Sequence, residues 1–205
     1  MVLKNLFRII NDYKFSLISV IFFELLYLIK GYKGNRFDFS TNERMTDNIP
    51  CPYYFLIKIK KNLEDNNFLK LLDLGCGSGR TIDFFNKNFP NKEFIGIEYF
   101  NKQYEYCKKN FKKHNNIKII QNDFTKLDFF QYDADCYFFN DPFGNNSDFI
   151  KFIENIVKFS LKKKILFIFV NYNKKVIEEL KNIKCIESFY ISDIKGYSIC
   201  YLNNN

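Results

Sequence analysis

The chain has 205 residues, 47% of them hydrophobic, and a formal net charge of +8. This length suits one α/β domain with an extension, and the hydrophobic content excludes wholesale disorder. The single histidine, His114, argues against a histidine base or a multi-histidine metal site. The positive charge is compatible with anionic partners, although a lysine-rich surface carries the same charge without one.

The cysteines also argue against a metal or redox site. None of the six has the Cys-x-x-Cys spacing of a metal or redox motif. Cys76, Cys136 and Cys185 lie in or beside apolar runs, where small buried residues occur. We therefore expect reduced thiols, no metal, and a cytoplasmic location.

The chain begins with a predicted extension over residues 1–51. A short helix is expected over 3–12, a second helix over the apolar run 15–29, and a loop over 31–51. The apolar run, "FSLISVIFFELLYLI", would span about 22 Å as a helix, short of the roughly 30 Å hydrocarbon core. Glu24 also interrupts it.

Three roles stay open for this run. It could pack on the domain or on a partner protomer, lie in a membrane interface, or span a membrane. The interfacial role would make the protein peripheral at the inner membrane face through residues 1–30. The basic residues that support this role are Lys4, Arg8, Lys14, Lys30, Lys33 and Arg36.

Residues 52–205 predict a Rossmann-like domain, because strand and helix patterns alternate along them. A helix over 52–64 leads into it. Short, continuously apolar strands are typical of a parallel sheet buried on both faces. We expect strands over 69–74, 93–98, 117–121, 134–140, 164–171, 184–191 and 197–202. We expect helices over 79–88, 102–114, 146–161 and 173–181. Because only "DIKG" separates the last two strands, they should form an antiparallel hairpin.

A glycine-rich turn follows the first strand, in "LLDLGCGSGR" over residues 71–80. Gly75, Gly77 and Gly79 allow a sharp backbone turn and the close approach of a ligand. The first turn of the next helix would present free N–H groups to an anionic group. A dinucleotide fingerprint would place its third glycine where this chain has Arg80, which disfavours an NAD-dependent oxidoreductase.

Acidic residues end the next two strands. Glu98 ends "FIGIE", where a carboxylate can accept hydrogen bonds from ribose hydroxyls. Asp123, in "IIQND", could accept a hydrogen bond from an adenine amino group. Together with Asp73 they lie at the carboxyl ends of three consecutive strands. The sequence therefore predicts a crevice for a nucleoside cofactor.

These motifs resemble those of the class I, seven-stranded S-adenosylmethionine-dependent methyltransferases. The resemblance covers residues 66–205 and implies an α/β, doubly wound, mostly parallel sheet with the strand order 3-2-1-4-5-7-6. It implies that S-adenosylmethionine is the cofactor, that Glu98 holds its ribose and that Asp123 holds its adenine. It places the methionine part against Asp73, Gly75, Cys76, Gly77, Ser78 and Gly79.

A narrower resemblance links residues 36–59 and "FFNDPFG", residues 138–144, to a group of uncharacterised bacterial class I methyltransferases. The inserted Asp141 departs from their N-P-F pattern, and the group adds no substrate. By position, Asn140 borders both the cofactor and the acceptor. Pro142 and Phe143 are candidate substrate-binding residues.

Methyl transfer from a sulfonium is an in-line displacement, so the protein mainly positions an acceptor lone pair and excludes water. Asn140 and Asp141 are the candidate catalytic residues, with Asp141 as the candidate base for a hydroxyl acceptor. Nucleic-acid amino-methyltransferases have D/N-P-P-Y/F at this place. The single proline here argues against base methylation.

The predicted function is methyl transfer to a nitrogen or oxygen atom. The acceptor could be a small molecule, a glycan or lipid-linked substrate, or a protein lysine. Two alternatives stay open, a nucleic-acid amino-methyltransferase and a non-catalytic protein that binds S-adenosylmethionine. Residues 31–51 lack a dense patch of arginine and aromatic residues, so the sequence does not favour a nucleic-acid partner.

Overall fold

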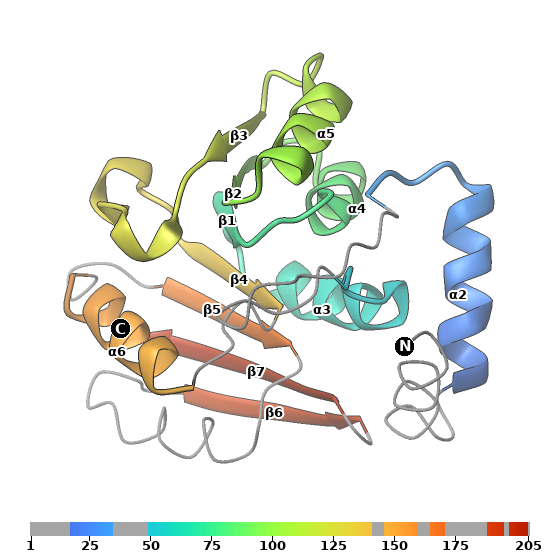
Figure 1. Ribbon diagram of the computed structural model, residues 1–205. Helices are drawn as coiled ribbons and strands as arrows, with labels where there is room; N and C mark the ends of the chain where they lie inside the picture. The colour runs from blue at the N-terminus through green and yellow to red at the C-terminus, as the bar shows by residue number, and fades with distance from the viewer. Residues whose placement is uncertain are drawn as a thin grey trace.

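A computed structural model describes residues 17–34, 49–140, 146–159, 165–170, 188–194 and 197–204. Five neighbouring parallel strands make up one side of a single sheet, out to one of its edges (Figure 1). They are β1 (Lys70–Leu74), β2 (Glu93–Glu98), β3 (Ile117–Gln121), β4 (Cys136–Asn140) and β5 (Ile165–Val170). The sheet continues with two antiparallel strands, β6 (Ser188–Ile194) and β7 (Tyr197–Asn204).

The strand order is β3-β2-β1-β4-β5-β7-β6, which is the order that the family resemblance implies. The parallel strands with helices on both faces confirm the predicted α/β fold. The helices are α2 (Leu17–Ile29), α3 (Tyr53–Asp65), α4 (Arg80–Asn88), α5 (Asn101–Phe111) and α6 (Asn146–Phe159). Two short 3-10 helices, η2 (Phe124–Lys126) and η3 (Phe129–Tyr132), were not predicted. The helices expected over 3–12 and 173–181 lie outside the described residues.

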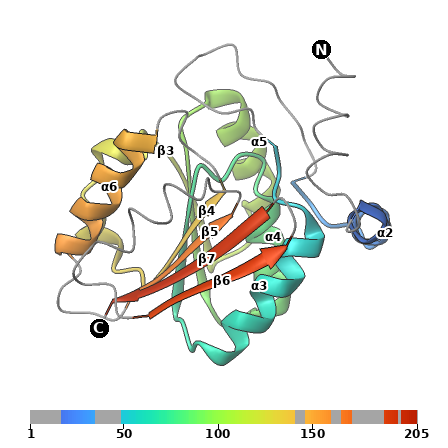
Figure 2. The same ribbon diagram turned by 90° about the horizontal axis from the view of Figure 1, so that it is seen from below.

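Two hydrophobic clusters cover the two faces of the sheet, because successive strand residues point to opposite sides. Phe138 belongs to the cluster under α3, α4 and α5, whereas Phe139 belongs to the cluster under α6. Figure 2 shows α3 and α4 on one side of the sheet and α6 on the other. The free thiols Cys51, Cys76, Cys107 and Cys136 are all buried, as predicted for Cys76 and Cys136; Cys185 lies outside the described residues.

The sheet register brings three predicted site residues to one face. Asp73 lies opposite Gly96 on β2 and Phe138 on β4. Residues two positions further along a strand point to the same side. Glu98 and Asn140 therefore share the α4 side of the sheet with Asp73, and all three lie at or near the carboxyl ends of parallel strands. Ligands of open α/β sheets bind at this edge.

Helix α2 packs one of its sides on the same face of the sheet. Val20 is buried in the cluster under α3 and α4, and Phe23 and Tyr27 pack against that cluster. The Tyr27 ring stacks on the Tyr53 ring of α3, with 4.6 Å between centroids and 12° between planes. Among the described residues, no helix is long and apolar enough to cross a membrane. The predicted division of the chain at residue 51 stays a prediction.

Candidate functional site

The glycine turn joins β1 to α4 and is tied to the next strand. The backbone N–H groups of Gly75 and Cys76 both donate to the Ile97 carbonyl, at 3.0 Å each. Gly75, Gly77 and Gly79 have φ angles of 80°, 53° and 87°. This left-handed region costs other residues about 1–2 kcal/mol, which explains why the turn uses glycine.

Gly79 also has no room for a side chain. A Cβ atom there would lie 2.6 Å from Cε2 of Phe111 and 2.7 Å from Sγ of Cys107, both on α5. Gly79 is the residue before α4, and its carbonyl accepts the first helical hydrogen bond, from the Asp83 N–H. The third glycine therefore lets α5 pack closely against the start of α4.

Glu98 lies at the tip of β2, beside the glycine turn. It is buried, at 5% exposure. Its Oε2 accepts from the Gly77 N–H and its Oε1 from the Phe100 N–H, both at 2.8 Å. Burial raises the pKa of Glu98, and the hydrogen bonds from Phe100, Gly77 and Tyr99 partly oppose that rise. Glu98 thus holds the glycine turn in place, and its carboxylate keeps acceptor capacity for a ligand.

Asp73 lies beside this carboxylate and is 2% exposed. Its Oδ2 is buried and has no hydrogen-bond partner among the described residues. Burial raises the pKa of Asp73 well above its ordinary value, and the charge of Glu98 raises it further. A buried acceptor without a donor costs about 1–3 kcal/mol. This atom is therefore the strongest structural sign of a position that suits a hydrogen-bond donor from a ligand.

Asp123 follows β3 and has a different environment. Its Oδ1 accepts from the Thr125 N–H at 3.1 Å and from the Thr125 hydroxyl at 2.6 Å. Lys126 forms an ion pair with it at 3.3 Å. Burial raises the pKa of Asp123, but these hydrogen bonds and the Lys126 charge outweigh that effect and lower it. Asp123 therefore caps η2, and its role toward adenine stays a prediction.

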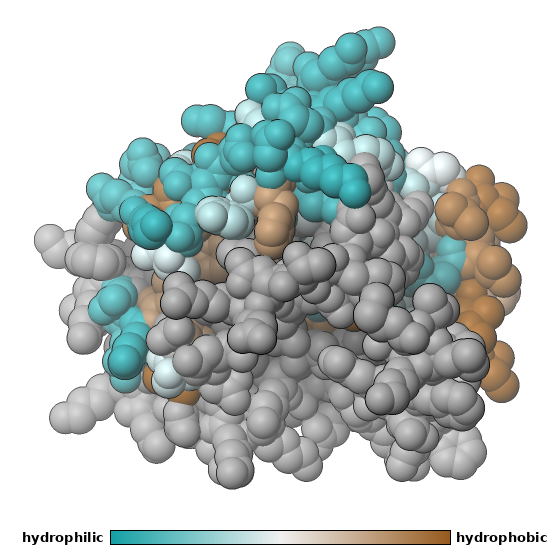
Figure 3. Space-filling view, in the orientation of Figure 1, coloured by the Kyte–Doolittle hydropathy of each residue, from teal (hydrophilic) through white to brown (hydrophobic). Residues whose placement is uncertain are grey.

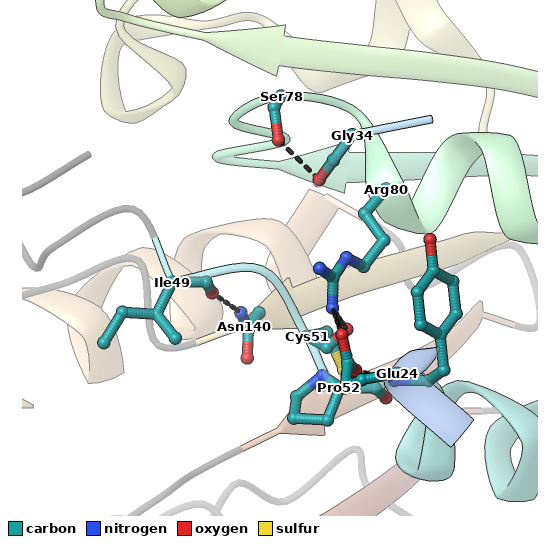
Figure 4. A network of polar contacts seen from close by, with 9 residues as sticks. Glu24, Gly34, Ile49, Cys51, Pro52, Ser78, Arg80 and Asn140 are labelled. Atoms are coloured by element: carbon teal, nitrogen blue, oxygen red, sulfur yellow. Dashed lines mark hydrogen bonds and ion pairs between the residues drawn. The ribbon is translucent and has the colours of Figure 1, made fainter. Parts of the chain in front are cut away.

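Ser78, a predicted cofactor residue, contacts the chain that precedes the sheet. Its hydroxyl donates to the Gly34 carbonyl at 2.7 Å (Figure 4). Gly34 has a φ of 78°, and a Cβ atom there would collide with the backbone nitrogen of Arg80. The Lys33 N–H also donates to Asp83, at 2.7 Å. Residues 33 and 34 therefore lie directly on the glycine turn and the first turn of α4.

A partly buried ion pair fixes α2 to the same turn. Arg80 is 3% exposed, and its Nη1 lies 2.8 Å from Oε2 of Glu24 on α2. The same nitrogen lies 3.4 Å from the Cys51 carbonyl (Figure 4). Glu24 also accepts from the Tyr53 N–H at 2.9 Å. The charge that interrupts the apolar run thus faces the domain and joins α2, α3 and α4.

The acceptor side of the site is described only at its first residue. Asn140 ends β4, and its Nδ2 donates to the Ile49 carbonyl at 2.9 Å. Its Oδ1 is the amide atom available to accept a hydrogen bond. Asp141, Pro142 and Phe143 lie outside the described residues, so their predicted roles stay predictions.

The structure adds residues that the sequence analysis missed. Tyr99 and Phe100 follow Glu98, are 48% and 37% exposed, and lie edge to face with centroids 5.5 Å apart. Their position directly after a strand-end carboxylate was the available signal. Gly34 and Glu24 were missed because they bond to residues 44 and 56 positions away.

Comparisons with known proteins point to one class. Residues 71–162 match the family model described as a methyltransferase domain. The tRNA (guanine-N(7)-)-methyltransferase of Buchnera aphidicola is 33% identical over 81 residues, and the match spans 35% of this chain and 34% of that protein. The match therefore spans only about a third of the length of that relative.

Two solved structures share the fold. The RNA methyltransferase from Salinibacter ruber, in complex with S-adenosyl-L-homocysteine, superposes with a TM-score of 0.58 at 16% identity, over 76% of this chain and 94% of that chain. The N-methyltransferase NodS from Bradyrhizobium japonicum, with the same ligand, gives 0.56 at 14% identity, over 74% and 85% of the two chains. The family match begins at the glycine turn described above. These findings confirm the resemblance that the motifs suggested: residues 71–162 match a methyltransferase domain, and the fold is the one found in these two S-adenosylhomocysteine-bound methyltransferases.

Proposed function

We propose that this protein binds S-adenosylmethionine at the carboxyl ends of β1 and β2 and transfers its methyl group to a nitrogen or oxygen atom beside the end of β4. The observation that carries this proposal is the buried pair of carboxylates, Asp73 and Glu98, next to the glycine turn. Burial and the charge of Glu98 both disfavour ionisation of Asp73 by raising its pKa, and Oδ2 of Asp73 has no donor among the described residues. A cationic ligand offsets both costs.

The residues present fit this cofactor. Its methionine ammonium is a donor of the kind that Asp73 Oδ2 lacks, and its ribose hydroxyls suit the remaining lone pairs of Glu98. Tyr99 and Phe100 offer exposed aromatic faces beside Glu98 for the adenine ring. The bound cofactor supplies an activated methyl group on a sulfonium. The chain orients it through the glycine turn and excludes water with residues 33 and 34.

On the acceptor side, Asn140 would orient the incoming lone pair through Oδ1, because its Nδ2 is bonded to Ile49. Asp141, the next residue, would take the proton of a hydroxyl acceptor. Asp141→Asn should then lower turnover and leave cofactor affinity nearly unchanged. Full activity would indicate an amine acceptor that needs no base, and a large loss of cofactor affinity would place Asp141 in the cofactor site.

Two measurements test the proposal. Titration calorimetry should show S-adenosylmethionine and S-adenosylhomocysteine binding in the micromolar range, about −8 kcal/mol. NADH is the control, and NADH binding without S-adenosylmethionine binding would refute the proposal. Purified protein with methyl-labelled cofactor and fractionated lysate should then label one class of acceptor: small molecule, glycan or lipid, or protein.

A second candidate is methylation of an RNA base. It is supported by the similarity to part of a tRNA methyltransferase and by the net charge of +8. A ring nitrogen with a free lone pair needs no base, so this acceptor would not require Asp141. Label that disappears on treatment with ribonuclease, and persists on treatment with protease, would select this candidate over the others.

A further inference from the structure

Helix α2 presents a wide apolar face to the outside of the molecule. Its six outward residues are each more than half exposed, from 51% for Ile21 to 84% for Ile29. At 100° per residue they lie within an arc of about 120° of the helix. They are Ile18, Ile21, Phe22, Leu25, Leu28 and Ile29. Figure 3 shows them as a brown patch at the right edge of the molecule, over α2.

The face contains no charge, because the one charged residue of the helix points the other way. Glu24 is bonded to Arg80 and to the Tyr53 N–H on the inner side of α2. Exposed apolar patches of this kind mark interaction sites in soluble proteins. The charge that argued against a membrane role in the sequence is therefore held in an ion pair beside the apolar face, and its side chain is 30% exposed there.

Positive charge flanks the face. Lys30 follows α2 directly and is exposed, and its Nζ lies 5.2 Å from the centre of the Tyr27 ring. In the sequence, Lys14 precedes the helix by three positions, and Lys4 and Arg8 lie upstream. Asp12 is the one acidic residue in the first 16 positions. An apolar face with basic flanks is complementary to anionic lipid.

We propose that α2 docks this protein in the plane of an anionic lipid bilayer, with these six side chains in the interface. At 13 residues the helix is about 20 Å long, too short to cross the hydrocarbon core. Lying in the plane, it buries the whole face and leaves its inner side, with Val20 and Glu24, packed on the domain. The carboxyl edge of the sheet is then held close to the lipid through the Glu24–Arg80 pair.

A second copy of the chain is the competing occupant, since four of the six residues have the 4-3-4 spacing of a coiled-coil seam. In a coiled coil, charged positions beside the seam usually set the pairing. The four positions beside this seam are all uncharged: Ser19, Ile21, Leu26 and Leu28. Ile21 and Leu28 also belong to the exposed face, so the face is wider than a coiled-coil seam. A broad apolar face fits a planar bilayer better than one partner helix.

The test is co-sedimentation of the full-length protein with vesicles of phosphatidylcholine alone or with phosphatidylglycerol added. The wild type should bind the anionic vesicles, and less as salt rises. Leu25→Gln/Leu28→Gln should lower the partition coefficient at least about tenfold, because two buried leucines are lost. Leu69→Gln is the matched control, since Leu69 is 66% exposed but lies outside α2. Its binding should equal that of the wild type.

Four results would overturn the proposal. The first is no vesicle binding by the wild type, and the second is equal binding to neutral and anionic vesicles. The third is a dimer in sedimentation velocity that Leu25→Gln/Leu28→Gln dissociates, which would assign the face to a second copy. The fourth is binding by a chain without residues 1–16 but not by the full chain, which would mean that this segment covers the face.

Discussion

The two acidic residues that end neighbouring strands differ more in the structure than in the sequence. Glu98 is buried, accepts from two backbone N–H groups, and has a raised pKa. Asp123 is bonded to Thr125 and Lys126 within its own loop and has a lowered pKa. Glu98 is the last residue of β2 and holds the glycine turn, whereas Asp123 lies two residues beyond the end of β3 and caps its own loop. We therefore assign the cofactor contacts first to Glu98 and Asp73.

The largest expected effect is on stability and comes from a substitution in the glycine turn, which Glu98 holds in place. Gly79→Ala should destabilise the fold by about 2–5 kcal/mol, because the residue has positive φ and its Cβ would overlap Phe111 and Cys107. That loss corresponds to a melting temperature lower by roughly 2–4 °C per kcal/mol. Thermal unfolding measures it, and an unchanged melting temperature would show that α5 can move away from the turn.

Glu98→Ala should weaken S-adenosylmethionine binding by about 1.5–3 kcal/mol, since hydrogen bonds to a charged group are lost. Glu93→Ala is the matched control, because Glu93 begins the same strand and its side chain is 63% exposed. Glu98→Gln keeps an acceptor for the Gly77 N–H and separates cofactor contact from turn geometry. Calorimetry that finds equal affinities for Glu98→Ala and Glu93→Ala would remove Glu98 from the site.

The pKa of Asp73 gives a pH-dependent prediction. Because its folded pKa is raised, its favourable contribution to folding is present below the unfolded value of about 4 and is lost as pH rises through the folded value. Without cofactor, Asp73→Asn should therefore gain stability over the wild type as pH rises, by about 1–3 kcal/mol. Unfolding by urea across this range measures the difference. A constant difference would mean that Asp73 does not titrate in this window.

Asp123→Asn should have the smallest effect on cofactor binding, within about 1 kcal/mol, because Thr125 and Lys126 already engage its carboxylate within its own loop. Its effect on stability has the opposite sign to that of Asp73. A lowered folded pKa stabilises the wild type above the unfolded value, and that contribution is lost as pH falls through the folded value. A loss of affinity as large as that of Glu98→Ala would restore Asp123 to the cofactor site.

Local patterns were sufficient to predict the five parallel strands, the glycine turn and the position of Glu98, whereas β6 (Ser188–Ile194) extends three residues past the strand expected over 184–191. The features that were predicted depend on residue periodicity or on positions close in sequence, as in the run from Leu71 to Arg80. The layer over the site was not predictable in this way. The Asn140–Ile49 hydrogen bond joins residues 91 positions apart, and no periodic pattern encodes such a contact.

Helix α2 shows the same limit. The sequence placed a helix over 15–29, and the described helix covers Leu17–Ile29. The sequence left open what this helix packs against and did not show which of its sides faces the domain. That choice depends on Arg80 and Tyr53, which receive Glu24 and Tyr27 in the folded protein.

The most direct test of this account is a crystal structure of the protein with S-adenosylhomocysteine. We predict that its ammonium group lies within hydrogen-bond distance of Asp73 Oδ2, directly or through one water, and that its ribose hydroxyls contact Glu98. Occupancy of this kind would satisfy the one buried oxygen of Asp73 that lacks a donor. A ligand bound away from the glycine turn, or a ribose held by Asp123 with Glu98 contacting only the backbone, would contradict it.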